Sequence, residues 1–188
     1  MRIRPAEFVA MPWKNGQGVT HEIAREPASG VQFLWRLSLA EVAASGDFSL
    51  FPGYDRTIAL VSGEGMELAF EEAPTKRLDR PMQPFAFKGE WHCRSRLLGG
   101  PCRDLNLMVD RAHATSDAEC LALDGGLVPR HVAKGWLLAY CAAGEVSIGS
   151  EKAKAGEVLK LAAGRHDVIV KGQALLFAIH LTPGTLRA

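Results

Sequence analysis

The sequence predicts an all-β protein, either a sandwich or a barrel, with little helix. Turn-forming residues are frequent, with 19 glycines and 10 prolines among 188 residues. The segments between the turns are short, and they are either apolar or alternate between apolar and polar side chains, as strands do. Stretches with helical periodicity are scarce. Many short strands joined by Gly/Pro turns are typical of sandwiches and barrels.

The first half contains several clear strand patterns. Residues 33–40 alternate, so that Trp35 and Leu37 share one face of the expected strand while Arg36 and Ser38 share the other. The next expected strand, residues 57–61, is a run of apolar residues, which is typical of a strand buried on both faces. Two further strands are expected at residues 66–70 and 105–109.

The second half repeats this style of short apolar runs between turns. Its expected strands are residues 136–142, 146–148, 158–161, 168–170 and 174–181. Residues 112–120 are polar and short, so we interpret them as the connection between the two halves. Residues 162–167 contain a glycine and several polar residues and are expected to form a turn.

An offset of 80 residues relates the two halves. Apolar runs of the first half then fall on apolar runs of the second, 58–61 on 138–141 and 66–68 on 146–148. This indicates a duplication, which favours a repeated architecture. We therefore expect an N-terminal half with the ligand pocket at residues 1–115 and a smaller C-terminal half at residues 116–188.

Composition and charge argue against several classes of protein. Lys and Arg number 22 and Asp and Glu 21, whereas duplex binding needs clustered, unopposed cations, so we expect no nucleic-acid partner. The apolar runs are far shorter than the roughly 20 residues of a membrane span, and none follows the charged N-terminus. We therefore expect no membrane partner and no secretion. Four cysteines without a C-x-x-C pair fit free thiols in a cytoplasmic protein.

The second half resembles the cupin superfamily at one turn, but it departs from cupins at the metal-binding position. Gly156 is followed by five residues and then by Ala-Ala-Gly at 162–164, where cupins carry Pro-x-Gly and, three residues later, a metal-binding histidine. That position is Asp167, and His166 lies one residue early, on the opposite face of a strand. The first cupin motif needs His-x-His, whereas the histidines here are scattered singly. We expect no bound metal and no other cofactor.

The segment at residues 12–23 is rich in polar residues and glycine. Asn15-Gly16 is a strong signal for a hairpin or loop, because both residues tolerate positive φ. Glycine also lets backbone amides approach a ligand closely, and Lys14 beside such a loop can hold an anion. The alternative is an ordinary solvated loop.

Two expected strands carry polar side chains on one face. Arg36 and Ser38 share a face of the first, and Asp104 and Asn106 share a face of the second, which suggests a common polar cavity. A guanidinium inside a barrel needs an anionic partner. That partner is either a protein carboxylate, for which Asp104 is the obvious candidate, or a ligand carboxylate bound in bidentate fashion.

A charged pair, Asp55-Arg56, leads directly into the expected strand at 57–61. Pro52-Gly53 just before it fits the central pair of a type II turn. The pair either closes a salt bridge at the mouth of the barrel or contributes to the polar cavity, where Arg56 is a second cation that Asp104 can neutralise.

Taken together, these segments resemble the HutD/Ves family. The runs typical of that family are matched in order at residues 12–23 (with Gln17 replacing a glycine), 35–42, 46–56 and 104–108. The resemblance implies a metal-free cupin-like fold, an RmlC-like jelly roll with two barrel-like halves (a bicupin). It also implies an association with bacterial histidine utilisation, in a regulatory role, and a small carboxylate ligand such as formylglutamate or urocanate.

The leading hypothesis is therefore a binding protein for a small anionic metabolite, regulatory or buffering in histidine utilisation. Two cations that converge in a pocket of low dielectric constant bind an anion far better than they do on the surface. The candidate ligand-binding residues carry charges, amides, a hydroxyl or a close backbone, and they are Lys14, Asn15, Gly16, Arg36, Ser38, Asp55, Arg56, Asp104 and Asn106.

Two other classes of function are kept open. One is a metal-free isomerase, lyase or hydrolase acting on a small carboxylate, with His21, Glu22 and Asp104 as the available proton carriers. The other is a protein-interaction module whose exposed edge strands pair with a partner or form a homodimer.

Overall fold

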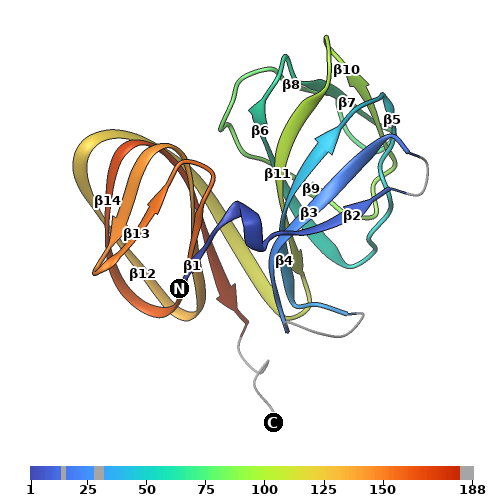
Figure 1. Cartoon of the computed structure of the whole chain (residues 1–188). Helices are drawn as coiled ribbons and strands as arrows, with labels where there is room; N and C mark the ends of the chain where they lie inside the picture. Colours follow the sequence, from blue (N-terminus) through green and yellow to red (C-terminus); the bar gives the residue numbers. More distant parts are fainter. Residues whose placement is uncertain (14–15, 28–31, 183–188) are drawn as a thin grey trace. The chain divides into compact units, whose positions relative to one another are not determined.

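The computed structural model describes residues 1–13, 16–27 and 32–182, and this part of the chain is almost entirely β structure (Figure 1). The all-β prediction is confirmed. The elements of the first part are β1 (Arg2–Ile3), the 3-10 helix η1 (Pro5–Glu7), β2 (Val9–Pro12), β3 (Gly18–Glu26), β4 (Trp35–Val42), β5 (Gly46–Asp47), β6 (Tyr54–Ser62), β7 (Met66–Phe70), β8 (Lys76–Leu78), β9 (Phe85–Lys88), β10 (Cys93–Leu97) and β11 (Cys102–Asp110). The remaining elements are β12 (Ala114–Ile148), β13 (Glu151–Lys154) and β14 (Val158–Leu181).

The chain divides into two compact units. One is Phe8–Arg111, and the other joins Met1–Glu7 to the chain from Ala112 onward. The first seven residues, which the sequence analysis places with the first half, thus belong to the other unit, because β1 pairs with β14 through Ile3 and Val158. Figure 1 shows this blue strand beside the orange strands of the C-terminal part.

Two sheets build the unit Phe8–Arg111. The larger has six strands in the order β2-β3-β4-β11-β6-β9, and the smaller has four in the order β5-β10-β7-β8. Apolar side chains of both sheets form one core cluster: Ile58 and Leu60 come from the larger sheet, and Met66 and Leu68 from the smaller. The sheets therefore pack face to face through their apolar side chains, as in a sandwich.

Both faces of strand β4 are covered by other parts of the chain. Trp35 and Leu37 are fully buried, and the polar residues Arg36 and Ser38 alternate with them and point to the other face. Ser38 lies opposite Asn106, which lies opposite Ile58, so Arg36 and Ser38 share the face that is turned toward the smaller sheet. Trp35 and Leu37 are buried on the opposite face. The alternation between the two faces is as expected.

The other unit is dominated by two long strands. β12 and β14 pair in antiparallel fashion over most of their length, and Trp136 pairs with both Ala162 and Ile179. This part of β12 therefore lies between two segments of β14. Glycines with positive φ accompany changes of register along the strands, as at Gly125 and Gly135.

Two expectations for this unit are wrong. Residues 112–120 were expected to connect the halves and 162–167 to form a turn, but both lie largely in strands: Ala114 pairs with Leu181, and Asp167 pairs with Pro129. The polar side chains there lie on solvent-exposed faces of the strands. An antiparallel pair of strands needs only one buried face, so the residues on its exposed face can have the polar composition of a loop.

The cysteines agree with the sequence analysis. All four cysteines are free thiols, and Cys120 is the one that is not buried. Across the described ranges of the chain, no helix has the length and apolar character needed to cross a membrane.

Candidate functional site

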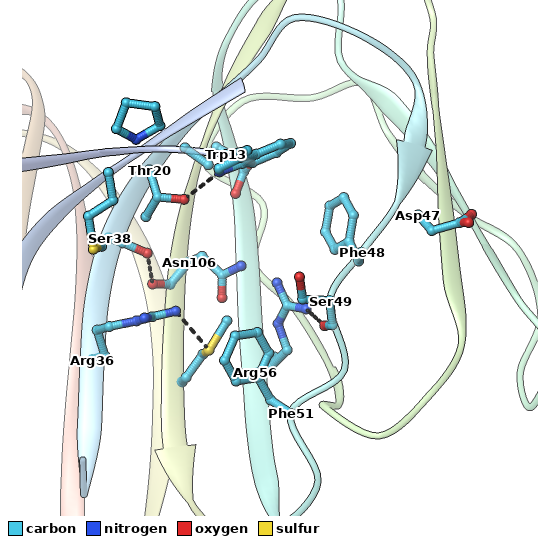
Figure 2. A pocket seen from close by; sticks show the side chains of 15 residues that line it. Trp13, Thr20, Arg36, Ser38, Asp47, Phe48, Ser49, Phe51, Arg56 and Asn106 are labelled. Atoms are coloured by element: carbon cyan, nitrogen blue, oxygen red, sulfur yellow. Dashed lines mark hydrogen bonds between the residues drawn. The ribbon is translucent and has the colours of Figure 1, made fainter. Parts of the chain in front are cut away.

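A pocket of about 700 Å³ lies within the unit Phe8–Arg111. It lies on the face of the six-stranded sheet that carries Arg36, Ser38 and Asn106, and it is walled by the chain that follows β5 (Figure 2). Because two guanidinium groups line it, we call it the arginine pocket.

The register of three neighbouring strands explains why these side chains meet. Met108 on β11 lies opposite both Arg36 on β4 and Arg56 on β6, and Asn106 lies opposite Ser38. Side chains that are directly opposite in adjacent strands point to the same face. The polar positions that the sequence places two residues apart therefore form neighbouring rows on one surface.

Arg36 is held by aromatic and sulfur contacts. Its guanidinium carbon lies 4.9 Å from the ring centroid of Phe33 and 5.5 Å from that of Phe51. One guanidinium nitrogen is 3.5 Å from the sulfur of Met108, and Nε has no hydrogen-bond partner in the protein. Burial lowers the pKa of Arg36, and the nearby charge of Glu22 partly offsets this effect.

Arg56 is the more deeply buried cation, with 5% of its surface exposed. Its guanidinium carbon lies 4.9 to 5.7 Å from the centroids of three rings, those of Phe48, Phe51 and Phe87. One N–H donates a long hydrogen bond of 3.5 Å to the carbonyl of Ser49, and Nε has no partner. Burial lowers the pKa of Arg56 to about 10, which leaves it cationic at neutral pH.

Neither guanidinium forms an ion pair with a carboxylate in the part of the chain that the structure describes, since no carboxylate oxygen lies within 4.0 Å of Arg36 or Arg56. The alternative in which Asp104 neutralises one of them as a direct partner is therefore not realised. Aromatic rings stabilise a cation through their faces without using its N–H groups. The hydrogen-bonding edges of both arginines are thus left for another acceptor.

Asp104 and Asn106 bring further unsatisfied atoms to the arginine pocket. Asp104 is 1% exposed, and neither of its carboxyl oxygens has a hydrogen-bond partner; the same holds for Oδ1 of Asn106. Burial raises the pKa of Asp104 to about 7, although the charge of Arg56 opposes the shift. An unpaired buried polar group costs roughly 1–3 kcal/mol, more if it is charged. Such a cluster is typical of a binding site.

The walls of the pocket include aromatic residues that the sequence analysis did not single out. They are Trp13, Phe48 and Phe51. The indole of Trp13 donates a 2.8 Å hydrogen bond to the hydroxyl of Thr20, which fixes the ring at the edge of the pocket. These residues lie within two of the segments that resemble the HutD/Ves family, residues 12–23 and 46–56. Large apolar side chains are usually expected to pack in a core, so the sequence alone does not mark them as pocket residues.

Not all of the predicted site residues meet in the pocket. Arg36, Ser38, Arg56, Asp104 and Asn106 line it together.

Two predicted residues lie elsewhere, and two are not described. Gly16 is exposed in the turn between β2 and β3 and does not line the pocket. Asp55 accepts a 2.8 Å hydrogen bond from Arg111, which also binds Glu90, so Asp55 closes a salt bridge with a partner other than Arg56. Lys14 and Asn15 lie outside the described residues.

Comparison with known proteins identifies close relatives. The sequence profile of the HutD family matches residues 5–182. Over 107 residues the chain is 45% identical to an uncharacterised 21.2 kDa protein in the hutC 3' region of Pseudomonas putida. That match spans 56% of this chain and 56% of the relative, about half of its length. HutD from Pseudomonas fluorescens SBW25, a solved structure, is 34% identical, with a TM-score of 0.87 over 97% of this chain and 98% of that one.

More distant structures support the fold. A variant of Bacillus subtilis oxalate decarboxylase is 7% identical, with a TM-score of 0.66 over 96% of this chain and 76% of that one. Such a likeness shows the fold alone, and it confirms the expected cupin-like architecture. Because the family profile spans nearly the whole chain and the Pseudomonas fluorescens structure matches 97% of it, the chain belongs to the HutD family.

Proposed function

We propose that the arginine pocket binds a small anionic metabolite, a carboxylate, without a metal ion. The observation that carries this proposal is the pair of guanidinium groups, Arg36 and Arg56, which share one pocket without a carboxylate partner among the described residues. Two like charges in a low-dielectric site repel each other, and an anion between them relieves that repulsion. A carboxylate also accepts the N–H bonds that the rings leave unused.

The remaining lining residues suit a small ligand with both polar and apolar parts. The hydroxyl of Ser38 and the amide of Asn106 line the pocket in the row next to the two cations and can hydrogen-bond to neutral groups of a ligand (Figure 2). The aromatic residues Trp13, Phe48 and Phe51 provide apolar surface. A few polar groups on mostly apolar walls are typical of small-molecule sites.

Membership of the HutD family suggests which carboxylate to test first. The Pseudomonas putida relative carries the hutC region in its name, and the Pseudomonas fluorescens HutD structure is described as a formate condition. Formate is the smallest carboxylate. We therefore propose formylglutamate or urocanate as ligands, with a regulatory or buffering role in histidine utilisation.

Calorimetric titration with formate, N-formyl-L-glutamate and urocanate tests the proposal. We expect at least one of them to bind, and we expect Arg36→Gln and Arg56→Gln each to weaken binding about 10- to 100-fold, because a charge-assisted hydrogen bond contributes roughly 1.5–3 kcal/mol. Arg94→Gln is the matched control, because the Arg94 side chain is 79% exposed. Unchanged affinity in both pocket variants contradicts the proposal.

One observation also favours the second candidate, a metal-free enzyme acting on a small carboxylate. Asp104 has a pKa of about 7 and lines the same pocket, and a group of that pKa is suited to general acid–base catalysis near neutral pH. Incubation with intermediates of histidine breakdown separates the candidates, because an enzyme consumes its substrate and a binding protein does not. Turnover that is lost in Asp104→Asn favours the enzyme.

A further inference from the structure

The carboxyl group of Asp104 is buried in the arginine pocket without a direct partner. Asp104 lies on β11, two residues from Asn106 and on the same face of the sheet. Both of its oxygens lack a hydrogen-bond partner, and no guanidinium nitrogen lies within 4.0 Å of them. The side chain is therefore held in a site that offers it no donor from the described protein.

Each strand around Asp104 contributes different charged or titratable groups. Arg56 on β6 acts on Asp104 through space, and Arg36 on β4 lines the same pocket. On β5, Asp47 is exposed, and Figure 2 shows its carboxylate turned away from the other labelled side chains. Cys102 on β11 has its own pKa raised to about 11 by burial and by Asp104, so it stays neutral.

The remaining neighbours complete this environment. On β3, Thr20 lies opposite Ala40, which in turn lies opposite Asp104, so this row adds no charge. In the next row, Glu22 lies opposite Ser38 and acts on Arg36 through space. Cys93, on β10 in the smaller sheet, is buried and has a pKa raised to about 11. Arg56 is thus the group that favours the ionised form of Asp104, and burial is the effect that opposes it.

A bound anion changes this balance in one direction. A carboxylate held by Arg36 and Arg56 cancels part of the positive field that favours ionised Asp104, and it also adds a like charge to the same cavity. Two carboxylates that share a desolvated site raise each other's pKa, so one of them takes up a proton more readily. A protonated carboxyl, in contrast, presents an O–H donor to the oxygens of the anion.

Resting on the proposed function, we infer that Asp104 is a specificity-determining residue, which takes up a proton when the anion binds and donates its O–H to the bound anion. The pocket then favours carboxylates that lack a free ammonium group. An ammonium placed there meets two guanidinium groups and needs Asp104 ionised. We therefore expect N-formyl-L-glutamate to bind and L-glutamate, which carries the ammonium, to bind at least tenfold more weakly.

Calorimetry with formate and N-formyl-L-glutamate in buffers of different ionisation enthalpy measures the protons taken up. Because Asp104 is already about half protonated at pH 7 before binding, we expect uptake of about half a proton per anion at pH 7 and close to about one proton near pH 8. The affinity should fall by up to about tenfold per pH unit above pH 7. Asp104→Asn keeps a donor but cannot titrate, so binding should persist without uptake and without this pH dependence. Asp117→Asn, in which an 86% exposed carboxylate is removed, should behave as the wild type.

A second measurement needs no substitution at Asp104. In protein labelled with carboxyl-¹³C aspartate, we expect the titration midpoint of Asp104 to rise when formate saturates the pocket. A midpoint that stays or falls overturns the inference, and so does equal proton uptake in the wild type and Asp104→Asn. If no anion binds to the wild type, the proposed function fails and the inference fails with it. Anion binding without proton uptake overturns the inference alone.

Discussion

Arg56, which is buried, and Arg36, which is half-buried, differ from most such cations in what surrounds them. Buried arginines are usually paired with carboxylates, whereas these two face the rings of Phe33, Phe48, Phe51 and Phe87 at 4.9 to 5.7 Å. Each such contact contributes about 0.5–2 kcal/mol. The rings thus hold the guanidinium groups in the pocket while their N–H groups remain available to an anion.

Asp104 should leave a signature in the pH dependence of stability. Its pKa is about 7 in the folded protein and 3.8 in the unfolded chain, so between about pH 4 and pH 7 the folded state retains a proton that the unfolded state releases. This contribution to the free energy of unfolding is present at low pH and is lost as the pH rises to about 7. Over that range the equilibrium constant for unfolding should increase by up to about tenfold per pH unit.

Urea unfolding between pH 4.5 and pH 8 measures this effect as the difference between the wild type and Asp104→Asn. The stability of the wild type should fall relative to that of the variant as the pH rises, and the difference should level off above pH 7. The exposed variant Asp117→Asn corrects for the general loss of a carboxylate. Parallel curves for wild type and Asp104→Asn would show that Asp104 is ionised throughout.

At the scale of the elements, close contacts at turns fix how the strands meet. Gly65, in the turn between β6 and β7, has a φ of +92°, and a Cβ built there would lie 1.9 Å from the carbonyl oxygen of Leu78. Both the backbone conformation and the space require glycine. The turn therefore sets where β7 begins and how it meets β8, with which Met66 pairs through Leu78.

A series of glycine substitutions separates these two requirements. Gly65→Ala should destabilise the protein most, by more than about 2 kcal/mol, because it adds a clash with backbone to the strain of a positive φ. Gly53→Ala meets no atom within 4 Å but has a φ of +85°, so about 1 kcal/mol is expected. Gly100→Ala has neither problem and should be nearly neutral. Denaturant unfolding of the three variants checks this order, and equal losses would contradict it.

The strands of the first unit were predictable because their alternation is strong. In β4, the buried Trp35 and Leu37 alternate with Arg36 and Ser38, and that period of two gives the polar face of the strand directly. The second unit was predicted less well. Residues at the start of β12, such as Asp117 and Glu119, face solvent. They belong to a strand because they pair with residues of β14 far along the chain, and the local sequence does not indicate that pairing.

The arginine pocket was predictable only in part. Shared strand faces grouped Arg36 with Ser38 and Asp104 with Asn106, and the register of β4 and β11 then joins the pairs. The distance between Asp104 and the guanidinium groups depends on the conformations of the side chains. The spacing of these residues along the sequence therefore could not show whether they form a salt bridge. The aromatic walls were missed for a related reason, since a phenylalanine that stacks on a guanidinium looks like any core residue.

At the scale of the whole molecule, charge is balanced but unevenly placed. The formal net charge is +1, yet the arginine pocket gathers two cations within a single unit, lined by residues between Met11 and Met108. Binding by this protein therefore depends on a local arrangement of charges, not on its net charge. The other unit contributes no residue to the described lining of the pocket.

A crystal structure of the protein with N-formyl-L-glutamate would show whether the arginine pocket binds a carboxylate. We predict electron density for a carboxylate whose oxygens lie about 2.7–3.2 Å from guanidinium nitrogens of both Arg36 and Arg56. Density for the ligand at another place, with both guanidinium groups turned to solvent or bound to carboxylates of the protein, would contradict the account.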